Sequence, residues 1–214
     1  MRVDPHRRIK EIASASEAAE RVLESCGVDY CCKGDVSLLE ACAGAGLNAR
    51  DVEKRLRELP DPKPHHWEDT VELVDHVIGV CHPRTHEALA RARAVAHGTA
   101  VHRTLDDLAT LATAQMKEEA SLFRHVRALA TARAARGPFP DPPFTTIRTH
   151  GRKLRERHAK MHDLLRQACA LARAPSVDSP PLRHAMAALE HALVAQMHLE
   201  NNELLPRARA LEPE

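Results

Sequence analysis

Imidazole and carboxylate side chains recur in the second half of the chain at positions that several helices would bring together. The candidate metal ligands are His82, His97, Glu118, His158 and Glu200. Iron binds imidazole nitrogen and carboxylate oxygen, and a pair of irons needs carboxylates that bridge the two ions. Glu118 and Glu200 suit the bridging role because they would come from two different helices. Any one of the five is more often an ordinary surface residue, so their joint placement carries the prediction of an iron site.

A second group of candidate residues is the adjacent pair Cys31 and Cys32, the candidate catalytic thiols, which follow Gly27 in a glycine-flanked turn. Neighbouring Cα atoms lie about 3.8 Å apart, which is too close for an unstrained disulfide. We therefore expect two thiols rather than a disulfide, with Lys33 next to them favouring the thiolate form. Standing alone, the pair would be read as two small hydrophobic residues buried at a turn.

A stiff proline segment divides the chain into two parts. Residues 60–64 read Pro-Asp-Pro-Lys-Pro, which no helix can cross. We expect a double-cysteine helical domain over residues 1–60, a Pro-rich linker over 61–65 and a second domain over 66–214.

The second domain contains four long stretches whose apolar residues recur at helical spacing. They run over about residues 67–96, 101–136, 144–174 and 179–210. Gly137 and Pro138 terminate the second stretch, and Pro180 suits the first turn of the fourth. Long helices joined by short proline-containing loops form up-down-up-down bundles. The sequence therefore predicts an all-α fold, with a small helical N-terminal domain followed by a four-helix bundle.

The composition limits the classes of function. Hydrophobic residues make up 43% of the 214 residues and aromatic residues only 2%, so we expect a core of Leu, Val, Ala and Ile packed between helices. A net charge of +1 gives no attraction to nucleic acid or to an acidic membrane surface. We find no signal peptide and no apolar run of membrane-spanning length. Six cysteines without a secretion signal favour a reducing, cytoplasmic location.

The residues around these candidates resemble a known family. The stretch from Gly27 to Asp35, with its double cysteine, is similar to the short N-terminal domain of the repair-of-iron-centres (Ric) proteins. The bundle resembles their hemerythrin-like domain over residues 73–82, 96–98, 116–119 and 199–206. This resemblance covers nearly the whole chain. It implies a hemerythrin-like four-helix bundle with a di-iron centre, in a cytoplasmic protein that repairs iron–sulfur clusters after nitrosative or oxidative damage. It also implies damaged iron–sulfur proteins as partners and contact with nitric oxide or oxygen species.

The resemblance assigns iron to matching positions of this sequence, with two departures from the family pattern. The matching positions are His82, His97, Glu118, His158 and Glu200. In the family, each bridging carboxylate follows a histidine that lies one helical turn earlier on the same face. Those two positions hold Ala114 and Gln196 here. We therefore expect weaker iron binding and a centre that is di-iron, incomplete or mononuclear.

Other histidines offer a replacement for the two missing imidazoles. His162 lies one turn after His158 and is a further candidate metal ligand. His86 stands in the same relation to His82, and His102 is an alternative to His97 at the end of the first long helix.

Three functions remain open, with the oligomeric state undetermined. The first is an iron-binding repair protein with an atypical di-iron site, in which Cys31 and Cys32 assist the chemistry. The second is a non-catalytic thiol sensor or interaction module that has lost the full metal site. The third is a zinc or mononuclear iron protein that uses His82, His158 and a carboxylate. Two buried carboxylates facing each other repel and are costly to desolvate, and this favours a bound cation.

Overall fold

The computed structural model describes residues 3–61 and 67–213. The chain divides into two units, Met1–Trp67 and Glu68–Glu214, each of which we describe by itself. Both are helical, and within the described residues no β-strand is present. The all-α prediction is thus confirmed. The linker expected over residues 61–65 lies outside the described residues apart from its first position.

The N-terminal unit consists of four short helices with well-defined starts. In chain order they are α1 (Ile9–Ala13), α2 (Glu17–Ser25), α3 (Leu38–Gly44) and α4 (Ala49–Arg57). Ser16 and Asn48 accept hydrogen bonds from backbone N–H groups in the first turns of α2 and α4. Ser37 and Glu40 form a capping box at the start of α3. These caps fix the helix ends and so define the loop between α2 and α3, which carries the adjacent cysteines.

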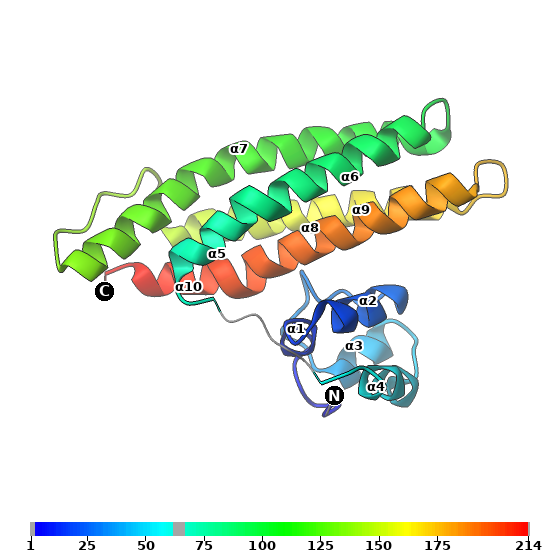
Figure 1. Ribbon diagram of the computed structural model, residues 1–214, viewed down its shortest axis with the longest axis horizontal. Helices are drawn as coiled ribbons and strands as arrows, with labels where there is room; N and C mark the ends of the chain where they lie inside the picture. Colours follow the sequence, from blue (N-terminus) through cyan, green and yellow to red (C-terminus); the bar gives the residue numbers. More distant parts are fainter. Residues whose placement is uncertain (1–2, 62–66, 214) are drawn as a thin grey trace. The chain divides into compact units, whose positions relative to one another are not determined.

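Four long helical segments make up the second unit (Figure 1). They are α5 (Thr70–His76) with η1 (Val77–Cys81) and α6 (His82–Val95), α7 (Ala100–Ala135), α8 (Ile147–Ala172), and α9 (Pro180–His198) with η2 (Leu199–Leu204) and α10 (Leu205–Leu211). In Figure 1 the α6–α7 and α8–α9 turns lie at one end of the bundle, and the α7–α8 connection lies at the other. Successive segments therefore run in opposite directions, which is the up-down-up-down bundle that the sequence predicts.

Aliphatic side chains fill the space between the four segments, as the composition predicts. α7 packs along α8, and α6 packs along α9. Leu105, Leu122 and Phe123 of α7 are all buried in this core. Gly151 of α8 allows a close approach to α10, because a Cβ atom at this position would meet Leu205 Cδ2 at 3.2 Å.

Two π-helical turns interrupt the first and last segments, where the sequence predicts continuous α-helix. In η1 the His82 N–H donates to Val77 O, five residues earlier, and in η2 the Leu205 N–H donates to Glu200 O. A proline follows each of these donors, at Pro83 and in α10. Proline has no N–H group, and its ring clashes with the carbonyl four residues earlier, so the backbone widens by one residue at each place.

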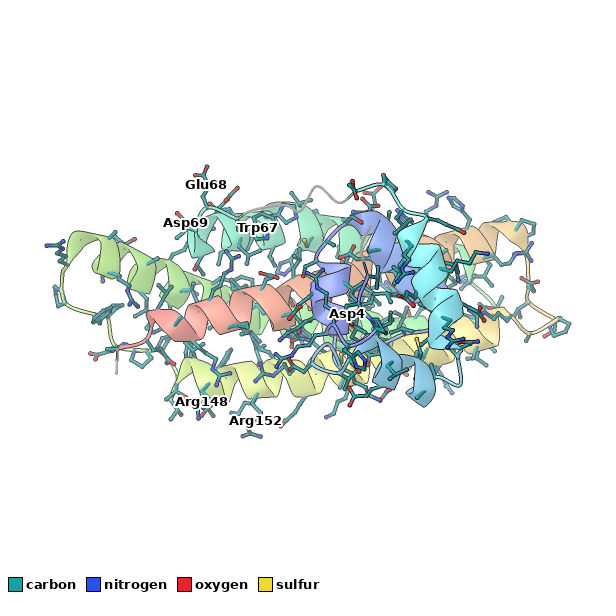
Figure 2. The ribbon with its side chains drawn as sticks, turned by 90° about the horizontal axis from the view of Figure 1, so that it is seen from below. Asp4, Trp67, Glu68, Asp69, Arg148 and Arg152 are labelled. Atoms are coloured by element: carbon teal, nitrogen blue, oxygen red, sulfur yellow. The ribbon has the colours of Figure 1, made fainter. Side chains whose placement is uncertain are left out.

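The outer surface of the bundle carries charged side chains, with Ile78 and Val80 among its exposed apolar residues. Arg148 and Arg152 extend from the outer side of α8, and Asp69 lies at the start of α5 (Figure 2). Asp69 caps that helix by accepting two backbone N–H hydrogen bonds, and Arg152 pairs with Glu156 one turn away at 2.7 Å. No helix in the described part of the chain combines the length and the apolar character that crossing a membrane requires.

The packing of α7 predicts how the bundle responds to a shortened side chain. Leu105→Ala should lower the free energy of unfolding by about 2–5 kcal/mol, because Leu105 is completely buried and its removal leaves a cavity. Leu171→Ala, on the partly exposed side of α8, should cost less than about 1 kcal/mol. Urea unfolding followed by circular dichroism measures both values. Equal losses in the two variants would contradict the packing described for α7.

Candidate metal centre and cysteine turn

Two imidazoles and two carboxylates meet in the interior of the bundle, each from a different helical segment. We call His82 of α6, Glu119 of α7, His158 of α8 and Glu200 of η2 the central cluster. His82 Nε2 lies 3.2 Å from Glu119 Oε2 and 3.4 Å from Glu200 Oε1. His158 Nε2 lies 3.0 Å from Glu200 Oε2 and 3.6 Å from Glu119 Oε1. All four segments of the bundle therefore contribute one ligand-type side chain, and each carboxylate faces His82 with one oxygen and His158 with the other.

The central cluster is shielded from solvent and contains polar atoms that lack hydrogen bonds. His158, Glu119 and Glu200 are at most 2% exposed, and His82 is half-buried. Within the described residues, His82 Nε2, Glu119 Oε2 and Glu200 Oε2 are buried without a partner in hydrogen-bonding geometry. Buried polar atoms are nearly always satisfied, so three such atoms at one point are the arrangement expected of cation ligands.

The spacing of the ligand atoms of His82, Glu119 and Glu200 fits a single metal ion, and His158 is not part of this group. Ligand atoms about 2.1 Å from an ion lie about 3.0 Å apart in an octahedron and about 3.4 Å apart in a tetrahedron. The imidazole–carboxylate distances in the central cluster are 3.0–3.6 Å. The offered atoms of His82, Glu119 and Glu200 all lie within 4.8 Å of one another. Imidazole nitrogen with carboxylate oxygen suits iron(II), manganese(II) and zinc(II).

Neighbouring side chains orient the two imidazoles. Asn201 Oδ1 lies 2.8 Å from His158 Nδ1, and an amide oxygen can only accept, so this nitrogen carries the hydrogen. In the neutral ring Nε2 then carries the lone pair, and Gln115 Nε2 lies 3.1 Å from it, in position to donate a hydrogen bond. The His82 ring stacks on Phe123 with 6.0 Å between ring centroids. The Asn201 contact explains why an asparagine directly follows Glu200.

The charges of the central cluster are strongly coupled. Burial alone would lower the pKa of both histidines, but the two carboxylates outweigh it and raise the pKa of His82 to about 9 and of His158 to about 10. Burial would likewise raise the pKa of Glu119, and the two imidazoles instead lower it to about 2. The carboxylates therefore demand positive charge, which either protons or a cation can supply.

Two glutamines stand one helical turn before the two carboxylates. Gln115 Nε2 donates to Glu119 Oε1 at 2.6 Å, and Gln196 Nε2 donates to Glu200 Oε1 at 2.9 Å. Both glutamines are buried. From the sequence, the two missing histidines were expected at Ala114 and Gln196. In the structure the position equivalent to Gln196 is Gln115, and Ala114 is exposed on the outside of α7.

The structure brings Glu119 into the central cluster in place of Glu118, which the sequence analysis assigned to a bridging role. Glu118 faces outward from α7 and forms an ion pair with Arg157 of α8, whose Nη2 donates to Glu118 Oε1 at 2.6 Å. Successive residues on a helix lie about 100° apart, so an error of one position moves the side chain off the buried face.

Two sequence signals identify the correct register. Buried residues of α7 recur at alternating steps of four and three: 108, 112, 115, 119, 122 and 126. Position 119 belongs to this series and position 118 does not. The internal repeat also aligns without a gap as Gln-Met-x-x-Glu, over residues 115–119 and 196–200.

The structure keeps the other candidate histidines apart from the central cluster. His97 is exposed in the turn after α6, and its ring lies 5.2 Å from that of His102. His102 Nδ1 contacts Arg93 O at 3.1 Å and so belongs to the same end of the bundle. His162 is half-buried one turn beyond His158, and His86 is exposed on α6. Of the predicted ligands, the structure brings together His82, His158 and Glu200.

The adjacent cysteines lie in a tight loop between α2 and α3. Their Sγ atoms are 3.3 Å apart. Asp29 Oδ1 accepts hydrogen bonds from the Cys32 N–H at 2.9 Å and from Cys31 Sγ at 3.3 Å. Tyr30 is fully buried and donates its hydroxyl hydrogen to Glu24 Oε1 at 2.7 Å, which anchors the loop on α2. None of the six cysteines, all of them in the described residues, forms a disulfide.

The two thiols differ in environment. Cys31 is buried and Cys32 is half-buried. The hydrogen bond with Cys32, burial and the Asp29 carboxylate all raise the pKa of Cys31. Lys33, expected to favour a thiolate, is exposed and is not among these influences. Asp29, Cys31 and Cys32 together offer ligand atoms within 4.8 Å of one another, a second place where a soft cation finds donors.

Comparison with known proteins gives two matches. A family model described as "ScdA_N: Domain of Unknown function (DUF542)" matches residues 5–60, which is the unit that carries the cysteine turn. The chain is also 28% identical over 127 residues to the "Probable iron-sulfur cluster repair protein" of Haemophilus influenzae. That alignment covers 56% of this chain and 57% of the relative, so the match spans little more than half the length of either protein.

Proposed function

We propose that this chain is a member of the repair-of-iron-centres family, that its bundle binds iron and that the protein helps repair damaged iron–sulfur clusters. The damage is nitrosative or oxidative, the partners are the damaged iron–sulfur proteins, and nitric oxide or oxygen species reach the bundle. The relative from Haemophilus influenzae carries a repair name, which supports this role by similarity.

The observation that carries the proposal is the central cluster itself. Two buried carboxylates and two imidazoles converge at 3.0–3.6 Å, and three of their polar atoms have no hydrogen bond in the described structure. A cation would satisfy these atoms and neutralise the carboxylates at once. The ligand types suit iron.

The residues of the bundle would divide the work as follows. His82, Glu119 and Glu200 would hold the ion. His158 faces the other oxygens of the two carboxylates, and Asn201 fixes the orientation of its ring. When bound, iron supplies redox chemistry or an open coordination position for a small diatomic molecule. Phe123 covers the His82 ring on one side and helps to exclude water.

We further propose that Cys31 and Cys32 take part in the repair reaction as thiols. Their Sγ atoms are close enough to act on one iron or one nitrosyl group together. The six cysteines without a disulfide support a reducing compartment, and we propose the cytoplasm.

A thiol sensor or interaction module without metal is the second candidate, and one observation favours it. Protonated His82 and His158 balance the charges of Glu119 and Glu200 without any cation, since the pKa values of both histidines are raised to about 9 and about 10. The metal-free bundle is therefore electrically neutral at this point, and iron has to displace protons to bind.

Iron binding distinguishes the two glutamates that stand side by side in α7. Glu119→Ala and Glu200→Ala should each weaken iron(II) binding by at least about 10-fold, because each removes a direct ligand and even outer contacts of a metal site have effects of that size. Glu118→Ala is the matched control and should bind iron as the native protein does. Iron per chain is measured after anaerobic reconstitution and desalting.

Two results would contradict this assignment. Native iron binding in Glu119→Ala, or loss of iron in Glu118→Ala alone, would remove Glu119 from the site. Circular dichroism of each variant checks that the bundle is folded before iron is added.

The thiols are tested separately from the bundle. Cys31→Ser combined with Cys32→Ser should leave iron per chain unchanged and should strongly lower the recovery of an iron–sulfur enzyme inactivated by peroxide or nitric oxide. Cys42→Ser, at a buried thiol of α3, is the control for a general effect on the N-terminal unit. Full recovery with the double variant would show that the adjacent thiols have no part in repair.

A further inference from the structure

Gln115 and Gln196 are the feature of the bundle that the proposed function leaves unexplained. They occupy equivalent positions in the two halves of the internal repeat, and each is only 1% exposed. A buried glutamine has four hydrogen-bonding positions to satisfy, so a pair of them next to charged residues is costly unless they have a definite task.

We infer that the central cluster holds one divalent cation. The amides of Gln115 and Gln196 hydrogen-bond to the carboxylates of the cluster, at the positions where a second metal ion would need two further imidazole ligands. This inference rests on the proposed function, because it accepts metal binding by the central cluster and fixes the number of ions. It also assigns Gln115 and Gln196 as positioning residues rather than ligands.

The orientation of the amides supports a hydrogen-bonding role. Each Nε2 donates to the Oε1 atom of the glutamate that follows on the same helix, at 2.6 Å for Gln115 and 2.9 Å for Gln196. One oxygen of each carboxylate is therefore engaged by an amide. The Oε2 atoms of Glu119 and Glu200 are the ones that the described residues leave without hydrogen bonds. A carboxylate that bridges two metals needs both oxygens, whereas one that binds a single ion needs one.

The donor count leads to the same number of ions. His82, Glu119 and Glu200 are the members of the central cluster whose ligand atoms all lie within 4.8 Å of one another, so one ion finds three protein donors there. His158 Nε2 lies 3.1 Å from Gln115 Nε2 instead. Two ions would have to share these four side chains. The amide nitrogens of both glutamines are engaged by the carboxylates, and their Oε1 atoms are buried without a hydrogen bond in the described residues.

Charge balance agrees with the donor count. Two carboxylates neutralise one divalent cation, and the imidazoles then bind as neutral ligands. A second divalent cation would bring two further positive charges into a site whose side chains are half-buried or fully buried. The central cluster has no third carboxylate to balance these charges. Uncompensated charge in such surroundings is strongly unfavourable.

The experiment uses manganese(II) as the probe and counts bound metal per chain in four versions of the full protein. These are the native protein, Q115H/Q196H, Q115L/Q196L and Q167H, the last adding an imidazole at an exposed position of α8. Bound metal is counted by mass spectrometry after desalting, and the electron paramagnetic resonance spectrum tells an isolated ion from an exchange-coupled pair.

The native protein and Q167H should hold one isolated ion per chain. Q115H/Q196H should hold two coupled ions, because it adds two nitrogen donors at the positions that precede the carboxylates. Q115L/Q196L should still hold one ion, about 10–100-fold more weakly, since it removes the groups that orient the carboxylates. If Q115H/Q196H does not fold, the count and the spectrum of the native protein decide alone.

Failure of the inference is distinct from failure of the proposed function. Two coupled ions in the native protein would overturn the single-ion inference and leave metal binding intact. Unchanged affinity in Q115L/Q196L would overturn the positioning role of the glutamines. No bound metal in the native protein, with manganese or with iron, would reject the proposed function as well.

Discussion

The mutual placement of Glu119 and Glu200 in the bundle interior is the constraint on which the other features of this unit depend. Both carboxylates lie within 3.4 Å of His82 Nε2 and are at most 2% exposed. Two negative charges in such surroundings are not tolerated without nearby positive charge, and this raises the pKa of both histidines far above the ordinary value. Protons and a divalent cation are alternative ways to meet the same electrostatic demand, which makes the cluster a natural metal site.

The surrounding structure can be understood as support for those two carboxylates. The glutamine one turn earlier on each helix engages one oxygen of each carboxylate, and Asn201 orients His158. The π-helical turns adjoin the cluster, since His82 directly follows η1 and Glu200 lies within η2. Extra residues of this kind are frequent at functional sites, because they shift the register of a helix locally. Here the prolines that follow both turns give a direct steric cause.

Much of the fold could be predicted from the sequence, because apolar periodicity and proline or glycine terminators are local signals. They predict the four long helical segments nearly to their ends. The π-helical turns were not predicted, although Pro83 inside a helical pattern is a visible sign of one. At the site, the structure brings three of the predicted ligands, His82, His158 and Glu200, into the central cluster. Glu118 was chosen over Glu119 because the resemblance alone does not distinguish adjacent carboxylates, whereas the four-and-three spacing of buried residues does. His97 lies in the α6–α7 turn, exposed and apart from the cluster, which resemblance could not reveal.

X-ray absorption spectroscopy of the iron-reconstituted native protein reports the atoms bound to iron. We expect nitrogen and oxygen ligands with the multiple scattering of imidazole rings, and no sulfur or second iron nearby. Sulfur ligands would place the iron at the cysteine turn and contradict a centre built on Glu119 and Glu200. A neighbouring iron would keep the centre in the bundle but contradict the single ion that Gln115 and Gln196 imply.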